Sequence, residues 1–133
     1  METAEKSAPV SPEAENYLAT AHRYEKNGWI AVHVEGAPFA RGYQHGYLLA
    51  AEIEDALRVA RFLALWDTGE EFDTFILAAQ QVFEPKIEAE YLQEIQGIAA
   101  GVAAAGINLT FNEILAWNAY QELLGNWWPN RGG

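Results

Sequence analysis

The stretch EGAPFARGYQHGYLLAAEI (Glu35–Ile53) lies where the sequence changes from a strand pattern to a helix pattern. Just before it, WIAVHVE (29–35) alternates with a period of two and is rich in β-branched residues, which predicts a strand. The glycines and the proline of GAPFARG indicate a turn. From about Phe39 or Arg41, apolar residues recur at steps of three and four, which predicts a long helix. The strand side chains expected to face a core are Ile30, Val32 and Val34.

Helical periodicity covers most of the remaining sequence, so the fold class expected is α+β, mostly α-helical with one strand near 29–35. Besides the helix after the turn, four more are expected. The first covers 11–26 and is stopped by Asn27-Gly28, and the second covers 69–84 and is opened by a Thr68–Glu71 capping box. The third covers 85–106 and is opened by Pro85, and the fourth covers 111–124, is opened by a Thr110–Glu113 capping box and is ended by Gly125. A single strand cannot form a sheet. We therefore expect residues 30–34 to pair with something outside this chain.

Composition narrows the classes of partner. Nineteen acidic and 8 basic residues give a net charge of −11, which opposes binding to nucleic acid or to an anionic membrane surface. Residues 1–10 are expected to form a flexible N-terminus, and residues 11–133 to belong to one domain. The N-terminus has no signal-peptide pattern, so the protein would be cytoplasmic if Met1 is native, and periplasmic or secreted if a signal peptide was removed.

No catalytic residue is expected within this chain. It contains no cysteine, and its only serines are Ser7 and Ser11 in the N-terminal segment, which argues against a thiol or Ser-His-acid nucleophile. No two of its three histidines are spaced four apart, so no metal site is expected. No phosphate-binding glycine pattern occurs, and no cofactor is expected.

Several polar and glycine positions have two interpretations each. Asn118 and Glu122 are four apart, hence on one helix face, and could form a structural hydrogen bond or contact a substrate. His45 could be packed or catalytic. Gly97 and Gly101 interrupt a good helix, and each costs about 1 kcal/mol relative to alanine, which favours close packing of this helix over a direct role in a site.

Three segments carry a resemblance to a known family. EGAPFARGYQHGYLLAAEI resembles the amino-terminal motif of the acyl-coenzyme A:6-aminopenicillanic acid acyltransferase family of self-processing amidases, which includes phospholipase B-like relatives. EIQGIAAGV (Glu94–Val102) is similar to the family's Glu-Ile-x-Gly-Ile-Ala-x-Gly motif, and WNAYQEL (Trp117–Leu123) to its Leu-Asn-x-x-x-Glu helix. In the first segment the matching residues are Gly36, Pro38, Phe39, Gly42, Tyr43, His45 and Gly46.

The resemblance implies an N-terminal-nucleophile (Ntn) hydrolase fold, an αββα sandwich completed by a second chain. In this family a precursor cuts its own backbone before a cysteine, which becomes the N-terminal nucleophile of a larger β chain. This chain ends NWWPNRGG, so the implied cut follows Gly133. The implied partners are that β chain, held non-covalently, and a small N-acyl substrate, and αβ units could pair as a dimer.

The substrate-binding residues expected from the resemblance and the aromatic tail are Asn118, Tyr120, Glu122, Trp127 and Trp128. The structural residues of its motifs are Gly36, Gly42, His45, Gly46, Gly97 and Gly101. Tyr120 stands where the penicillin-pathway enzyme has an arginine, which weighs against a penicillin-type substrate. Two alternatives stay open: a phospholipase B-like lipid or ester hydrolase, and a non-enzymatic helical binding module. The tryptophans could equally be core between two chains.

Overall fold

The structure, a computed structural model, describes residues 12–131 and consists mostly of helices with one two-stranded antiparallel sheet. The elements are α1 (Pro12–Leu18), β1 (His22–Lys26), β2 (Trp29–His33), α2 (Pro38–Leu48), α3 (Ala50–Thr68), α4 (Phe72–Ala78), α5 (Ala89–Ala104) and α6 (Phe111–Glu122). Two π turns, η1 (Ala79–Phe83) and η3 (Leu123–Trp127), and two 3₁₀ turns, η2 (Glu84–Lys86) and η4 (Trp128–Asn130), extend α4 and α6. The α+β, mostly helical class is thus confirmed. The expected flexible segment 1–10 and the cut after Gly133 lie outside the described residues.

The expected helix 11–26 is wrong in its second half, because residues 22–26 form β1. Asn27 and Gly28 have φ of 53° and 84°, and this pair of left-handed residues is the two-residue turn that favours a β-hairpin. β1 pairs with β2 in a register that places His22 opposite His33 and Lys26 opposite Trp29. The predicted strand therefore exists, but its partner lies within this chain and not outside it.

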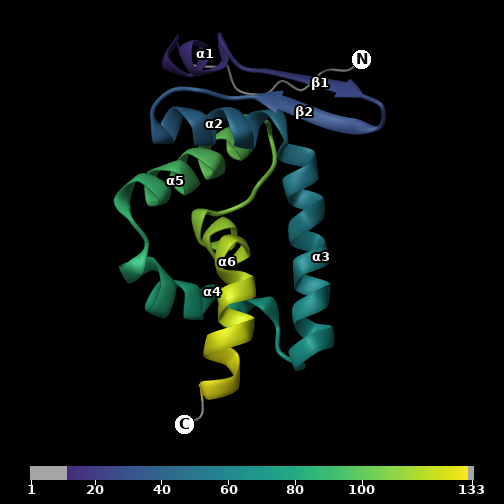
Figure 1. The fold of residues 1–133 in the computed structure, drawn as a ribbon, viewed down its shortest axis with the longest axis vertical. Helices are drawn as coiled ribbons and strands as arrows, with labels where there is room; N and C mark the ends of the chain where they lie inside the picture. The colour runs from purple at the N-terminus through teal and green to yellow at the C-terminus, as the bar shows by residue number, and fades with distance from the viewer. Residues whose placement is uncertain (1–11, 132–133) are drawn as a thin grey trace.

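The hairpin lies across the end of the molecule above α2 (Figure 1). Arg23 fixes it there, donating to the Leu48 carbonyl at 2.9 Å and to both carboxylate oxygens of Glu52 at 2.9 and 2.8 Å. The prediction that Ile30, Val32 and Val34 face a core fails for Ile30, which is exposed, while Val32 and Val34 are only partly buried. A two-stranded sheet with one face covered offers no deep core to its strands.

Helices α2 and α5 cross with their backbones in contact, and four glycines make this possible. A Cβ added at Gly42 would lie 2.0 Å from the Glu94 carbonyl oxygen, and one at Gly46 would lie 2.1 Å from the oxygen of Ile98. Gly97 and Gly101 face α2 in the same way: an added Cβ would lie 2.2 Å from the Phe39 carbonyl oxygen at Gly97 and 2.1 Å from the Tyr43 carbonyl oxygen at Gly101. We call these four residues (42, 46, 97 and 101) the glycine interlock. Close packing, the favoured interpretation of Gly97 and Gly101, is confirmed.

Two predicted helix starts are wrong. The Thr68–Glu71 segment does not open a helix: Gly69, at φ 77°, is the left-handed cap that ends α3, and the Thr68 hydroxyl donates back to the Ala64 carbonyl. Helix α4 begins only at Phe72. Pro85 lies in the 3₁₀ turn η2, and α5 begins at Ala89. In each case a residue that was expected to start the next helix belongs to the element before it: Thr68 to the end of α3, and Pro85 to the turn η2.

Helix α6 runs along the middle of the molecule, between α3 on one side and α4 and α5 on the other (Figure 1). Its predicted capping box is confirmed, since the Thr110 hydroxyl accepts from the Glu113 N–H at 3.1 Å while the Glu113 carboxylate accepts from the Thr110 N–H at 2.9 Å. Gly125 does not end the helical path, because it lies inside η3. Ile114, Leu115 and Ala119 are fully buried, so α6 is the centre of the core.

Candidate functional site

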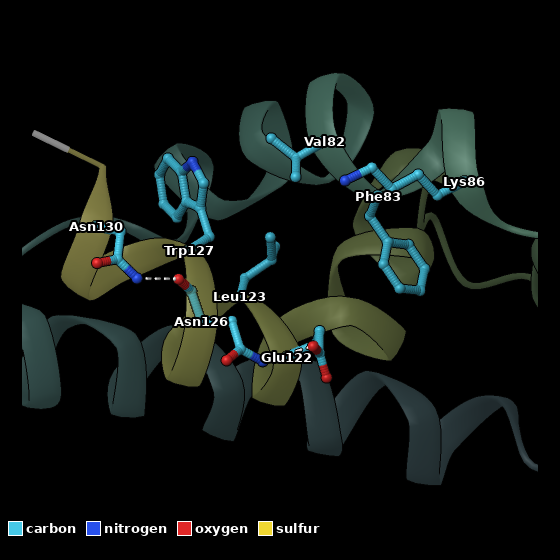
Figure 2. A pocket seen from close by; sticks show the side chains of 8 residues that line it. All are labelled: Val82, Phe83, Lys86, Glu122, Leu123, Asn126, Trp127 and Asn130. Atoms are coloured by element: carbon cyan, nitrogen blue, oxygen red, sulfur yellow. Dashed lines mark hydrogen bonds between the residues drawn. The ribbon is translucent and has the colours of Figure 1, made fainter. Parts of the chain in front are cut away.

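A cavity of about 370 Å³ lies beside the C-terminal end of α6; we call it the C-terminal cavity. Val82 and Lys86, from η1 and η2, lie on one wall, and Leu123 and Trp127, from η3, face them (Figure 2). The remaining lining residues are Phe83, Glu122, Asn126 and Asn130. The volume lies within the roughly 300–1,000 Å³ usual for pockets that bind small molecules. Four apolar and four polar side chains line it, which suits a ligand with an apolar body and a polar end.

A row of hydrogen-bonded polar residues follows the same cavity. The Asn126 side-chain amide donates to the Glu122 carboxylate at 2.5 Å, and the Asn130 amide donates to the Asn126 carbonyl at 2.9 Å (Figure 2). Lys86 forms no ion pair within residues 12–131, so its ammonium is available to an anionic or carbonyl group. Positions 118, 122, 126 and 130 are spaced by four, so the sequence did contain the signal for Asn126 and Asn130, which the sequence analysis missed.

The two predicted tryptophans differ in their surroundings. Both are partly buried and pack on Phe75, with ring centroids 5.9 Å away for Trp127 and 5.7 Å for Trp128. Trp127 also lines the C-terminal cavity. Trp128 instead has the Arg131 guanidinium over its ring. Of the pair, Trp127 is therefore the one placed to contact a ligand in this cavity.

A second cavity, of about 390 Å³, lies beside the middle of α6 and shares Phe83 with the first; we call it the histidine cavity. Its lining residues are His45, Phe83, Ile87, Tyr91, Glu94, Ile95, Ile98 and Asn118. His45 comes from α2, and its ring forms no hydrogen bond within the described part of the chain. Burial lowers the pKa of His45 below its ordinary value, and the nearby Glu94 carboxylate opposes this only in part. The imidazole is therefore neutral at pH 7.

The predicted pair Asn118 and Glu122 does not converge on one ligand. Asn118 lines the histidine cavity and its amide donates to the Ile114 carbonyl at 2.9 Å, whereas Glu122 lines the C-terminal cavity. Tyr120 is on another face of α6, is only 5% exposed, and packs edge-on against Phe75 with ring centroids 5.1 Å apart. Its hydroxyl has no hydrogen-bond partner among the residues described, and burial raises its pKa. The five predicted substrate-binding residues therefore do not line one common cavity.

Gln44 is a buried polar residue that the sequence analysis passed over, because it lies between the matching positions Tyr43 and His45 of the first motif. It is 2% exposed, and its side-chain oxygen accepts from the Glu35 N–H at 2.7 Å. Its amide donates to the carbonyls of Tyr17 and Glu35 at 2.7 and 2.9 Å. Gln44 therefore ties α1 and the segment after β2 to α2.

The described residues contain neither a candidate metal site nor a candidate membrane-spanning helix. No group of three or more histidine, aspartate or glutamate side chains there could hold a metal ion. No helix among them is long and apolar enough to cross a membrane.

The chain is similar to one protein of unknown role. Over 98 residues, 69% of the chain, it is 32% identical to an uncharacterized protein of Archaeoglobus fulgidus. The matched segment spans 16% of that protein's length. No family model matches the chain, and no solved structure matches it.

Proposed function

We propose that this chain is the α subunit of a self-processing amide hydrolase or acyltransferase with the Ntn fold, in which a second chain completes the αββα sandwich. The bond cleaved is the C–N bond of a small N-acyl compound. The nucleophile is the N-terminal cysteine of the second chain, and no residue of this chain breaks the bond. This chain would instead hold the acyl group and support the catalytic chain.

The observation that carries the proposal is the joint packing of two motifs that resemble the family. Residues 35–53 and 94–102 are about 40 residues apart in the sequence, yet their helices α2 and α5 meet through the glycine interlock. Gly42 and Gly46 each face a backbone oxygen of the second motif, and Gly97 and Gly101 each face a backbone oxygen of the first. One contact thus explains four of the glycines on which the resemblance rests.

The C-terminal cavity supports the same proposal, because it offers a place for an acyl group near the end of the chain. Leu123, Trp127 and Val82 supply apolar walls, and burial of a methylene group against such walls contributes about 0.8 kcal/mol. Lys86 and Asn126 supply donors that could hold a carbonyl or carboxylate at the polar end.

An exposed apolar face on α3 supports the presence of a second chain. Val59, Phe62 and Trp66 follow one another at helical spacing and are 55%, 63% and 77% exposed. Trp29 on the hairpin is 77% exposed as well. Contiguous exposed apolar residues mark surfaces that contact other protein. The archaeal relative, in which the matched segment is 16% of the length, is an example of such a segment joined to much more chain.

The first experiment is intact mass spectrometry of the protein produced from its full gene. The proposal predicts a 14.8 kDa species that copurifies with a larger one whose N-terminal residue is cysteine. A protein that stays one uncut polypeptide, or a gene whose only product is the 14.8 kDa chain, would refute the proposal.

A second experiment tests the acyl site. Trp127→Ala should lower kcat/KM for a long-chain N-acyl substrate by tenfold or more, because it removes an apolar wall worth about 1.5–3 kcal/mol, and should change the rate with the N-acetyl analogue much less. Trp128→Ala is the matched control, since Trp128 does not line the cavity. Equal losses on both substrates in Trp127→Ala would show that Trp127 serves only packing.

A further inference from the structure

The histidine cavity has buried apolar side chains, such as Ile95 and Ile98, and exposed polar ones, such as Tyr91 and Asn118; we call these two parts its apolar floor and its polar rim. Phe83, Ile87, Ile95 and Ile98 supply the apolar side chains. The polar groups are the side chains of His45, Tyr91, Glu94 and Asn118, three of them on α5 or α6. No lysine or arginine is among the lining residues.

The rim presents hydrogen-bond acceptors. The Asn118 amide nitrogen donates one N–H to the Ile114 carbonyl, so this side chain has its oxygen and its second N–H left for a ligand. Arg41 contacts Glu94 through Oε1 alone, at 3.3 Å, and within residues 12–131 the second carboxylate oxygen has no partner. The neutral His45 ring has one unprotonated nitrogen, which is a third acceptor.

We infer that the histidine cavity binds a primary ammonium group carried on a short apolar or aromatic body. An ammonium has three N–H donors and no acceptor, which matches the three acceptors of Glu94, Asn118 and His45. The apolar floor receives the body of the ligand. Tyr91 and Phe83 add aromatic rings, whose faces attract cations.

The charge of the site selects against the other simple ligands. A carboxylate would meet the Glu94 carboxylate in a chain of net charge −11, with no lining cation to pair with. An alcohol has one donor, so it would leave two of the three acceptors without a partner. Of these three ligands only the ammonium supplies a donor to each acceptor, and it would bind the second carboxylate oxygen of Glu94, whose first oxygen is bound by Arg41.

This inference does not depend on the proposed amide hydrolysis. Binding of an amine is measured at equilibrium, with no turnover and no acyl group present. A failure here would leave the mass-spectrometry result untouched, and a single uncut polypeptide would leave amine binding untouched.

The test uses isothermal titration calorimetry on the protein produced from its full gene, with 2-phenylethylammonium, 2-phenylethanol and 3-phenylpropanoate as probes of similar size. We expect the ammonium to bind about tenfold more tightly than the alcohol, the gain typical of a charge-assisted hydrogen bond, and the carboxylate not to bind. Glu94→Gln should remove that preference. Glu90→Gln, which makes the same charge change one turn away on α5 and outside the cavity, should keep it.

A second variant covers the possibility that Glu94→Gln disturbs the contact with Arg41. Asn118→Asp replaces an exposed amide by a carboxylate at the rim and should tighten ammonium binding severalfold. The inference is overturned if Glu94→Gln and Glu90→Gln weaken the ammonium equally, if Asn118→Asp leaves it unchanged, or if the alcohol or the carboxylate binds as well as the ammonium.

Discussion

Gly97→Ala tests the glycine interlock most directly. The added Cβ would lie 2.2 Å from the Phe39 carbonyl oxygen and 2.9 Å from the Tyr43 nitrogen. Both neighbours are backbone atoms of α2, so neither can rotate out of the way. Relief requires α2 and α5 to separate by roughly 1 Å, which loosens the contacts at the other glycines as well.

The magnitude follows from two opposing effects. Overpacking of a tight interface costs about 1–3 kcal/mol, and a clash between rigid backbones belongs at the upper end of that range. Alanine regains about 1 kcal/mol of helix propensity relative to glycine. We therefore expect Gly97→Ala to lower the free energy of unfolding by about 2 kcal/mol. For a domain of this size that is a fall in Tm of about 8 °C.

The assay is urea denaturation followed by circular dichroism, with Gly125→Ala as the matched control. Gly125 also lies in a helical turn, but an added Cβ there meets nothing within 4 Å. The control should therefore be neutral or gain up to about 1 kcal/mol. If Gly97→Ala is as stable as Gly125→Ala, the two helices are not in backbone contact, and the explanation of the motif glycines fails.

Three further changes have outcomes that follow from single residues. Gln44→Leu should lower the free energy of unfolding by about 3 kcal/mol in chemical denaturation, because it removes three hydrogen bonds from a buried side chain to the backbone. Gln93→Leu, at an exposed site of α5, should change it by less than about 0.5 kcal/mol. Thr110→Ala should cost about 1 kcal/mol through loss of the α6 cap, and an unchanged urea midpoint would contradict that role. Burial lowers the pKa of His45 in the folded state, so as the pH falls the unfolded chain takes up this proton before the folded chain does. The free energy of unfolding should therefore keep its full value above a pH of about 6.5 and decrease as the pH drops from there toward the lowered pKa. His45→Gln should flatten this part of the profile in thermal melts recorded from pH 7.5 to 5.

The helical part of the fold was predictable because apolar spacing and caps are local signals. The Thr110–Glu113 capping box fixes the start of α6 as expected, since both of its hydrogen bonds lie within four residues. The hairpin was missed although Asn27-Gly28 is the strongest short-range hairpin signal, because those residues also suit the end of a helix. An unpaired strand at 29–35 was itself the clue that residues 22–26 form its partner.

The site was less predictable, because cavities depend on how distant elements pack. Trp127 was expected at a site, and it lines the C-terminal cavity. Lys86 and Phe83 face it only because a π turn and a 3₁₀ turn follow α4, and nothing in the apolar spacing of residues 72–86 indicates where such turns occur. The position of His45 on a cavity wall likewise depends on the crossing of α2 and α5.

That crossing connects the two parts of the structure that the motifs describe. Glu94 meets Gly42 through its backbone oxygen while its side chain lines the histidine cavity, and Ile98 meets Gly46 in the same way. His45 directly precedes Gly46, so the glycine contacts set how far its ring stands from the carboxylate of Glu94. A rigid backbone contact is what a site built from two helices needs, because a shift of 1 Å separates acceptors that must reach one ammonium. The interlock therefore positions the histidine cavity as well as stabilising the fold, and a substitution that spreads α2 from α5 should weaken amine binding more than its cost in stability alone would.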